Sequence, residues 1–293
     1  MIDPPPRDSV PAHYPALASL HVAVLLFGLA GLFGKWIDLP AAAIVFGRAA
    51  IAAVALGAVL LRSPARRFGF EWRMAITGAV LALHWWAFFE AIRLSSVAIG
   101  LLGYASFPLF VVLLEAGWLR VTLRAVDMAT AGLVVAGLLV LVPEVRADAA
   151  VTSGLGWGVV SGLSFALLTV GNRALVPRRS PQTIAFWQNA CAAICLAPAL
   201  LSMPTLPGGR DLVLLLVLGV VCTALAHTLF IASMRTLRAH TAGVIAALEP
   251  AYGIALAALL LHELPAPRTI AGAALLVGAA LAATARATRV SSP

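Results

Sequence analysis

Charged residues are scarce in this sequence. Of its 293 residues only 11% are charged, whereas 62% are apolar and the mean hydropathy is +1.00. A soluble chain carries about a quarter charged residues, so this chain lacks the polar side chains needed to cover a water-facing surface. The shortage excludes a soluble globular domain and indicates a polytopic membrane protein.

Cysteine is also rare. The three cysteines, Cys191, Cys195 and Cys222, all lie within apolar runs. Disulfide frameworks and metal sites need other spacings and contexts. We therefore expect these thiols to be small buried hydrophobic groups.

Motifs of catalysis are missing as well. The chain has no phosphate-binding glycine loop, no metal-ligand motif and no serine, cysteine or histidine constellation at catalytic spacing. We expect no enzyme, no cofactor and no metal. An integral membrane enzyme would need clustered polar residues near one membrane face, and a channel would need a polar pore; both stay remote alternatives.

The net charge of +8 does not indicate a nucleic-acid partner. Basic residues sit in short clusters at the edges of apolar runs, with no basic face and no nucleic-acid motif. Such clusters are typical of topology signals at a membrane surface.

The apolar runs predict an all-α polytopic fold. A membrane span needs about 20 mostly apolar residues, and ten candidates follow one another with short connections. They lie near 16–36, 41–62, 74–94, 96–118, 126–143, 154–174, 182–203, 212–233, 240–261 and 269–286.

The positive-inside rule orients these spans. With both termini cytosolic, one side holds fourteen basic residues and the other holds five, while Arg48 lies within a span. The cytosolic set comprises Arg7, Arg62, Arg66, Arg67, Arg73, Arg120, Arg124, Arg173, Arg178, Arg179, Arg235, Arg238, Arg286 and Arg289, against Lys35, Arg93, Arg146, Arg210 and Arg268.

The two halves of the chain are similar at an offset of about 140 residues. "YASFPLFVV" aligns with "AALEPAYGI", and Arg48 aligns with Asn189. Each half has five spans, an odd number, so the second must be inverted relative to the first, as in many secondary transporters. We predict four regions: a disordered cytosolic tail over 1–15, one five-helix repeat over 16–145, an inverted five-helix repeat over 152–286, and a second cytosolic tail over 287–293.

These motifs resemble a known family. The "LEP" followed by "HELPAPRTIAGAALLVGAALAA", and its counterpart "FPLFVVLLEAGWLRVTLRAVDMATAGLVVAGLLV", resemble EamA-type members of the drug/metabolite transporter superfamily. The chain is most similar to the aromatic amino-acid exporter (YddG-type) branch. The resemblance implies ten helices in two inverted bundles around a central cavity.

Pro108 and Pro250 occupy equivalent places about halfway along their spans. Each removes a backbone donor and bends its helix. We predict a pair of hinges that let half-helices swing during gating; a static kink for packing is the alternative.

Arg48 and Glu249 are the charged residues placed deepest in the spans. A charge at that depth needs partners or a function. They form a structural ion pair or anchor, or else Glu249 binds a substrate amino group or relays a proton. Glu115, near the end of its span, is interpreted as a boundary charge that snorkels or pairs.

The remaining candidates line a predicted aromatic cavity. Histidines in two spans can hydrogen-bond or take a proton, and aromatic surfaces suit ligands with rings or apolar chains. The predicted substrate-binding residues are His84, Trp86, Tyr104, Trp157, Ser164, Trp187, His227, Phe230 and Tyr252.

Together these features predict a secondary transporter in the bacterial inner membrane. It would export amino acids, aromatic or apolar ones favoured, by alternating access, with other small metabolites or cationic drugs as alternative substrates. Its partners would be a small-molecule substrate and the lipid bilayer. Glycine-rich faces in the fifth and tenth spans indicate close helix packing or a dimer surface, so the chain is expected to be a monomer or a homodimer.

Overall fold

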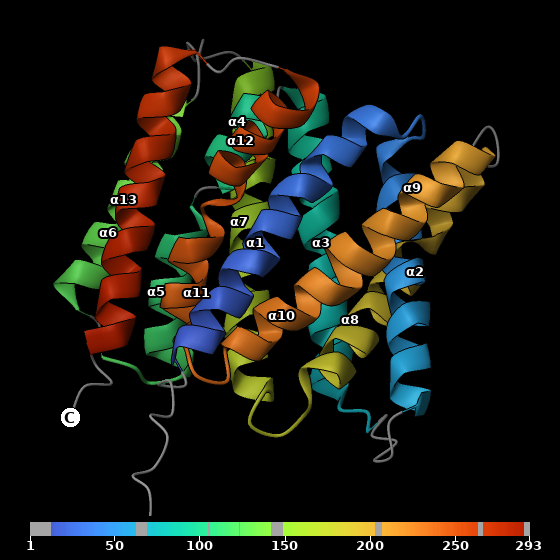
Figure 1. The fold of residues 1–293 in the computed structure, drawn as a ribbon, viewed down its shortest axis with the longest axis horizontal. Coiled ribbons are helices and arrows are strands. Elements are labelled where there is room, and N and C mark those ends of the chain that lie inside the picture. Colours follow the sequence, from blue (N-terminus) through green and yellow to red (C-terminus); the bar gives the residue numbers. More distant parts are fainter. Residues whose placement is uncertain are drawn as a thin grey trace, which may run out of the picture.

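The computed structural model describes residues 13–62, 69–95, 97–104, 106–122, 124–141, 149–202, 207–262 and 266–289, and these are helical apart from their connections (Figure 1). In lipid every backbone N–H and C=O must be satisfied internally, and an α-helix does this within one segment. The first half of the chain forms α1 (His13–Trp36), α2 (Ala41–Arg62), α3 (Trp72–Leu94), α4 (Val97–Tyr104), α5 (Phe107–Trp118) and α6 (Ala125–Leu141).

The second half repeats this order of elements. It forms α7 (Ala149–Leu175), α8 (Pro181–Leu196), the 3₁₀ segment η1 (Ala197–Ser202), α9 (Gly209–Gly219), the π-helical η2 (Val220–Leu225), α10 (Ala226–Ser233), α11 (Ala239–Ala246), α12 (Glu249–Leu261) and α13 (Pro267–Arg289).

The ten predicted spans correspond in order and position to these helices. Eight helical stretches in the described ranges are long and apolar enough to cross a membrane, and α6 is a shorter apolar helix. The one remaining span, the seventh in chain order (182–203), is α8 continued by η1. The predicted tails lie mostly outside the described residues, and the parts that are described, 13–15 and 287–289, are helical.

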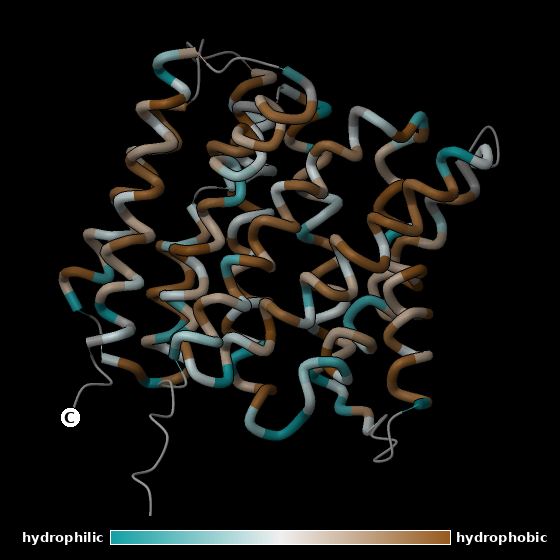
Figure 2. The backbone as a smooth tube through the Cα atoms, in the orientation of Figure 1, coloured by the Kyte–Doolittle hydropathy of each residue, from teal (hydrophilic) through white to brown (hydrophobic). Residues whose placement is uncertain are grey.

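Hydrophobic residues run along the helices, and hydrophilic ones gather at helix ends and connections (Figure 2). α1 begins at the lower edge of Figure 1, and α13 ends there. We call this edge the terminal face; it also carries the end of α2 and the connection between α7 and α8 (Figure 1).

Helix packing pairs the two halves. α1 packs against α10 and α12, and α7 packs against α3 and α4; α2 lies against α8, α5 against α11, and α6 against α13. When α4 with α5 is taken as the fourth span and α11 with α12 as the ninth, these contacts between spans map onto one another on exchange of the two predicted halves. In Figure 1, α1 runs upward from the terminal face, whereas α7 runs downward toward it.

Glycines allow the closest of these contacts. A methyl group on Gly272 of α13 would lie 2.7 Å from the Gly137 carbonyl oxygen of α6. The glycine-rich faces of the fifth and tenth spans therefore pack against each other within the chain. On α7, a methyl group on Gly158 would lie 2.8 Å from Gly103 Cα of α4.

The fourth and ninth spans are each broken into two helices. α4 ends at Tyr104 and α5 begins at Phe107; α11 ends at Ala246 and α12 begins at Glu249. In both cases proline is the second residue of the new helix, a position whose N–H has no partner within the helix. The sequence predicted bent helices here, and the structure shows breaks.

Candidate functional site

Arg48 of α2 lies at the junction between the two halves. Its Nε donates to Thr223 Oγ1 at 3.0 Å, and its Nη2 donates to the Cys222 carbonyl at 3.4 Å. Both acceptors belong to η2, where Thr223 Oγ1 itself donates to the Leu218 carbonyl at 2.8 Å. The guanidinium also lies 4.9 Å above the centre of the Trp85 ring, a cation–π contact.

Local packing explains this position of Arg48. A methyl group on Gly219 would lie 2.5 Å from Ile51 Cγ2, so α2 and the start of η2 approach closely. The π-helical turn then directs Thr223 and Cys222 toward α2, in keeping with the frequent occurrence of π-turns at functional sites.

Glu249 is the first residue of α12 and is half-buried. Its carboxylate makes no hydrogen bond or ion pair with any other residue that the structure describes. Arg48 is half-buried as well, and the two charges lie within electrostatic range of each other. The ion pair considered from the sequence is therefore not formed, because Arg48 directs its donors to η2.

Two histidines lie near Arg48 and are each hydrogen-bonded to another helix. His84 Nδ1 of α3 lies 2.9 Å from Ser161 Oγ and 3.1 Å from the Ser161 carbonyl oxygen of α7. His227 Nδ1 of α10 lies 3.1 Å from Asn189 Nδ2 of α8. His84 and His227 are also within electrostatic range of Arg48.

The hydrogen-bonded pair of His227 and Asn189 leaves two buried polar atoms without partners. His227 Nε2 and Asn189 Oδ1 are buried, and neither has a hydrogen-bond partner among the described residues. A buried polar atom without a partner is costly. Because the Asn189 amide nitrogen donates to His227 Nδ1, Nε2 carries the ring hydrogen. The two atoms therefore provide one donor, His227 Nε2, and one acceptor, Asn189 Oδ1, for a bound solute or water.

An aromatic cluster borders the same region. Tyr104 stacks on Phe107 with ring centres 4.9 Å apart, Phe165 lies edge-on to Phe107 at 5.1 Å, and Phe230 follows at 5.9 Å from Phe165. His84 lies 5.5 Å from Tyr104. Tyr104, His84, His227 and Phe230, four of the predicted binding residues, therefore lie in or next to one central region.

The other predicted binding residues are placed elsewhere. Trp86 is 50% exposed and pairs with Trp157 at 5.0 Å; the residue that contacts Arg48 is Trp85 instead, because one step along a helix turns a side chain by about 100°. Ser164 donates to backbone carbonyls of its own helix. Trp187 packs against Phe70, which precedes α3, and the Tyr252 hydroxyl is hydrogen-bonded to His21 at 2.9 Å.

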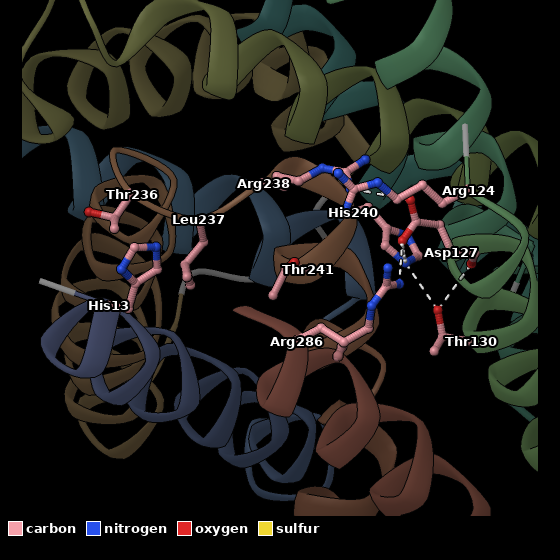
Figure 3. Close-up of a pocket in the computed structure, with 11 residues that line it drawn as sticks. His13, Arg124, Asp127, Thr130, Thr236, Leu237, Arg238, His240, Thr241 and Arg286 are labelled. Carbon is pink, nitrogen blue, oxygen red and sulfur yellow. Dashed lines mark hydrogen bonds and ion pairs between the residues drawn. The ribbon is translucent and has the colours of Figure 1, made fainter. Parts of the chain in front are cut away.

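A second polar site lies at the terminal face (Figure 3). Asp127 of α6 is 2% exposed and receives hydrogen bonds from Arg286 of α13 at 2.9 Å and from Arg238 at 3.2 Å. Glu115 of α5 is 1% exposed and accepts from Arg238 at 3.0 Å and from the Ala239 N–H at 3.0 Å. We call these residues, with His240, the Asp127 cluster.

The sequence analysis missed this cluster as a unit. Glu115 pairs, as one of the two interpretations held, but it is buried and does not snorkel. The signal that could have found it is charge complementarity at one membrane face. Glu115 was placed at the inner end of its span, on the side to which the topology assigned Arg238 and Arg286.

A pocket opens beside the Asp127 cluster. It has a volume of about 170 Å³. Its polar lining comes from α1, α6, α11, α13 and their connections, as Figure 3 shows. The lining includes His13, Arg124, Asp127, Arg238, His240 and Arg286.

Comparison with known proteins identifies the class of molecule to which this architecture belongs. The model of the EamA-like transporter family matches twice, at residues 15–142 and 152–285. The chain belongs to the EamA-like transporter family. The resemblance drawn from the "LEP" segment and its counterpart is thereby confirmed, and this EamA-like protein is a multi-pass membrane transporter.

Two relatives are similar over most of the chain. An uncharacterized transporter, YxxF of Bacillus subtilis (strain 168), is 25% identical over 253 residues, which are 82% of this chain and 80% of the relative. A crystal structure of a protein with 21% sequence identity matches with a TM-score of 0.82, over 95% of this chain and 99% of that chain. The second likeness is one of fold.

Proposed function

We propose that this EamA-like protein exports amino acids, with aromatic and other apolar ones favoured, by alternating access across the bacterial inner membrane. The observation that carries the proposal is the pair Arg48 and Glu249. They are opposite charges in the central region, within electrostatic range, and they do not pair with each other.

A zwitterion complements such a pair. The α-carboxylate would bind the Arg48 guanidinium, which η2 and Trp85 hold in place, and a planar guanidinium suits a carboxylate. The α-ammonium would bind Glu249. Arg48 has only uncharged partners, and Glu249 has no partner among the described residues. Charges without counter-charges are costly in a membrane interior, and a solute that brings both counter-charges removes that cost.

The side chain of the solute would lie against the aromatic cluster. Tyr104, Phe107, Phe165 and Phe230 provide an apolar surface next to His84, and ring–ring contacts add to the area that is buried. This arrangement favours aromatic and large apolar amino acids over small polar ones.

Symmetric packing of the halves supports alternating access. If the halves are inverted repeats, exchanging their conformations opens first one face and then the other. The terminal face carries most of the basic residues at its helix ends, so the proposed orientation places it in the cytosol. Pro108 and Pro250 would be the hinges.

Counterflow in proteoliposomes tests the proposal. Vesicles loaded with unlabelled phenylalanine should take up labelled phenylalanine with saturation, in assays run with and without a proton gradient. Phenylpropionate, which lacks the amino group, and phenylalanine amide, which lacks the carboxylate, should compete poorly. Uptake that is linear in concentration would refute a carrier.

Variants that remove one charge each test whether Arg48 binds the carboxylate and Glu249 binds the ammonium group. Arg48→Gln should weaken competition by phenylpropionate, and Glu249→Gln should weaken competition by phenylalanine amide. The matched controls are Arg93→Gln and Glu90→Gln. They remove one charge each from an ion pair at the C-terminal end of α3 and should leave transport unchanged. If both central variants transport phenylalanine like the wild type, the zwitterion site is refuted.

The second candidate is export of cationic drugs or other small metabolites. Glu249 without a partner favours it, since a lone carboxylate beside aromatic rings also suits an organic cation. A tetraphenylphosphonium arm in the same assay separates the two. Transport of that cation, abolished by Glu249→Gln and unaffected by Arg48→Gln, would support this candidate and exclude the zwitterion.

A further inference from the structure

The pocket at the terminal face has an excess of positive charge. Arg124, Arg238 and Arg286 line it, together with His13 and His240, whereas Asp127 is its single lining carboxylate. Glu115, the only other carboxylate bound to these arginines among the described residues, lies behind the lining and is bonded to Arg238 and the Ala239 N–H. Even with Glu115 counted, three arginines face two carboxylates.

Several donors around the pocket are not used. Arg286 donates through Nη1 to Asp127, and none of its other nitrogens bonds to a described residue. Arg238 Nε, also a donor, is buried without a partner in the part of the chain that the structure describes. The Arg124 side chain is exposed and makes no hydrogen bond or ion pair with the described residues.

We propose that this pocket is an oxyanion-binding site, which captures the carboxylate of the solute before it reaches the central region. The proposal rests on the proposed amino-acid transport and adds a second site to it. Guanidinium groups bind carboxylates through parallel hydrogen bonds. A volume of about 170 Å³ accommodates the carboxylate of an amino acid together with part of that amino acid's side chain.

Binding here would act on the contact between the two halves. Asp127 and Glu115 belong to the first half, and their arginine partners among the described residues, Arg238 and Arg286, belong to the second. An incoming carboxylate would compete with Asp127 for Arg286. Capture of solute would therefore weaken the ion pairs that join the two halves at the terminal face, and loading would be coupled to their separation.

Benzoate binding tests the site separately from transport. The full-length protein carrying Arg48→Gln, which removes the central guanidinium, is placed in neutral-lipid nanodiscs and titrated with benzoate by calorimetry. Arg286→Gln should weaken binding at least tenfold. Arg124→Gln should weaken it several-fold, and since Arg124 is exposed this variant does not disturb packing. Arg210→Gln, an exposed arginine away from the terminal face, is the control and should leave binding unchanged.

Asp127→Asn gives a result with the opposite sign. Because Asp127 competes for Arg286, its neutralisation should tighten benzoate binding several-fold. A purely structural cluster would show no gain. Equal binding by all variants, or weaker binding by Asp127→Asn, would overturn the proposal.

Two further comparisons test whether the oxyanion comes from solute or from lipid, and whether this site or the proposed function fails. If the pocket binds a lipid phosphate, anionic-lipid nanodiscs will abolish benzoate binding, and this outcome overturns the assignment to solute. Loss of zwitterion selectivity in counterflow with benzoate binding intact refutes only the proposed function. Intact selectivity with no effect of Arg286→Gln on benzoate refutes only this site.

Discussion

Pro108 and Pro250 occupy the same place in the two halves: each is the second residue of a helix that starts directly after a break. The two breaks share one backbone hydrogen bond: the Ser106 N–H donates to the Gly103 carbonyl at 3.2 Å, and the Leu248 N–H donates to the Ile245 carbonyl at 3.0 Å. At the first break Ser106 Oγ also donates to the Gly103 carbonyl, at 2.7 Å. Each half thus carries one joint between two short helices.

Pro250→Ala should slow transport and leave binding largely intact. Alanine restores an N–H that can donate to the Ala246 carbonyl, so α11 and α12 can join into one continuous helix. Stabilising the joined helix by about 1.4 kcal/mol would slow the exchange about tenfold. Counterflow rates and phenylalanine binding by calorimetry measure the two effects. Pro181→Ala, at the first residue of α8, is the control, and an unchanged rate for Pro250→Ala would argue against a hinge.

Gly28→Ala should destabilise the contact between α1 and α12. A methyl group there would lie 2.9 Å from the Gly253 nitrogen and 3.0 Å from the Glu249 carbonyl oxygen. These are backbone atoms, which cannot rotate away. We expect a loss of about 1–3 kcal/mol, visible as a lower melting temperature in detergent. Gly31→Ala on the same helix meets nothing within 4 Å and should melt like the wild type.

Thr223→Val should raise the KM for phenylalanine and change the maximal rate little. Valine has the shape of threonine but cannot accept the hydrogen bond from Arg48 Nε, so the guanidinium loses its orientation. A charged hydrogen bond contributes about 1.5–3 kcal/mol, which corresponds to at least roughly a tenfold increase in KM. Thr228→Val, whose hydroxyl only donates to the Ala224 carbonyl, is the control. Equal KM values for the two variants would contradict the role of Thr223.

Glu115→Gln should destabilise the fold measurably. The wild-type carboxylate accepts from Arg238 and from the Ala239 N–H while 1% exposed. An amide keeps one acceptor oxygen but leaves the guanidinium without its counter-charge, at a cost of about 1.5–3 kcal/mol. Glu90→Gln, whose partner Arg93 is exposed, is the control and should not change the melting temperature. Equal melting of both variants would show that the Asp127 cluster contributes nothing to stability.

The pattern of apolar residues predicted the helices well. Each span must satisfy its own backbone in lipid, so a run of about 20 apolar residues predicts both the position and the type of the element. The breaks were located by Pro108 and Pro250 themselves, because proline cannot donate within a helix. The π-helical η2 was not predicted, since no residue type in Val220–Leu225 marks a π-turn.

The candidate site was predicted in part. Arg48, Glu249, His84 and His227 stood out because ionisable groups within spans are rare. Trp86 was chosen over Trp85 because the sequence does not give the rotation of α3 about its axis, which the contact with α7 decides.

The sequence by itself thus determined the membrane class, the ten spans and the residues with unusual chemistry, since these follow from the local free energy of each segment in lipid. Only the tertiary structure decided the partners. Arg48 binds η2 rather than Glu249, and Asp127 meets Arg238 and Arg286 across the two halves. Such pairs join residues more than 100 positions apart, and their geometry depends on how closely small residues let the helices approach.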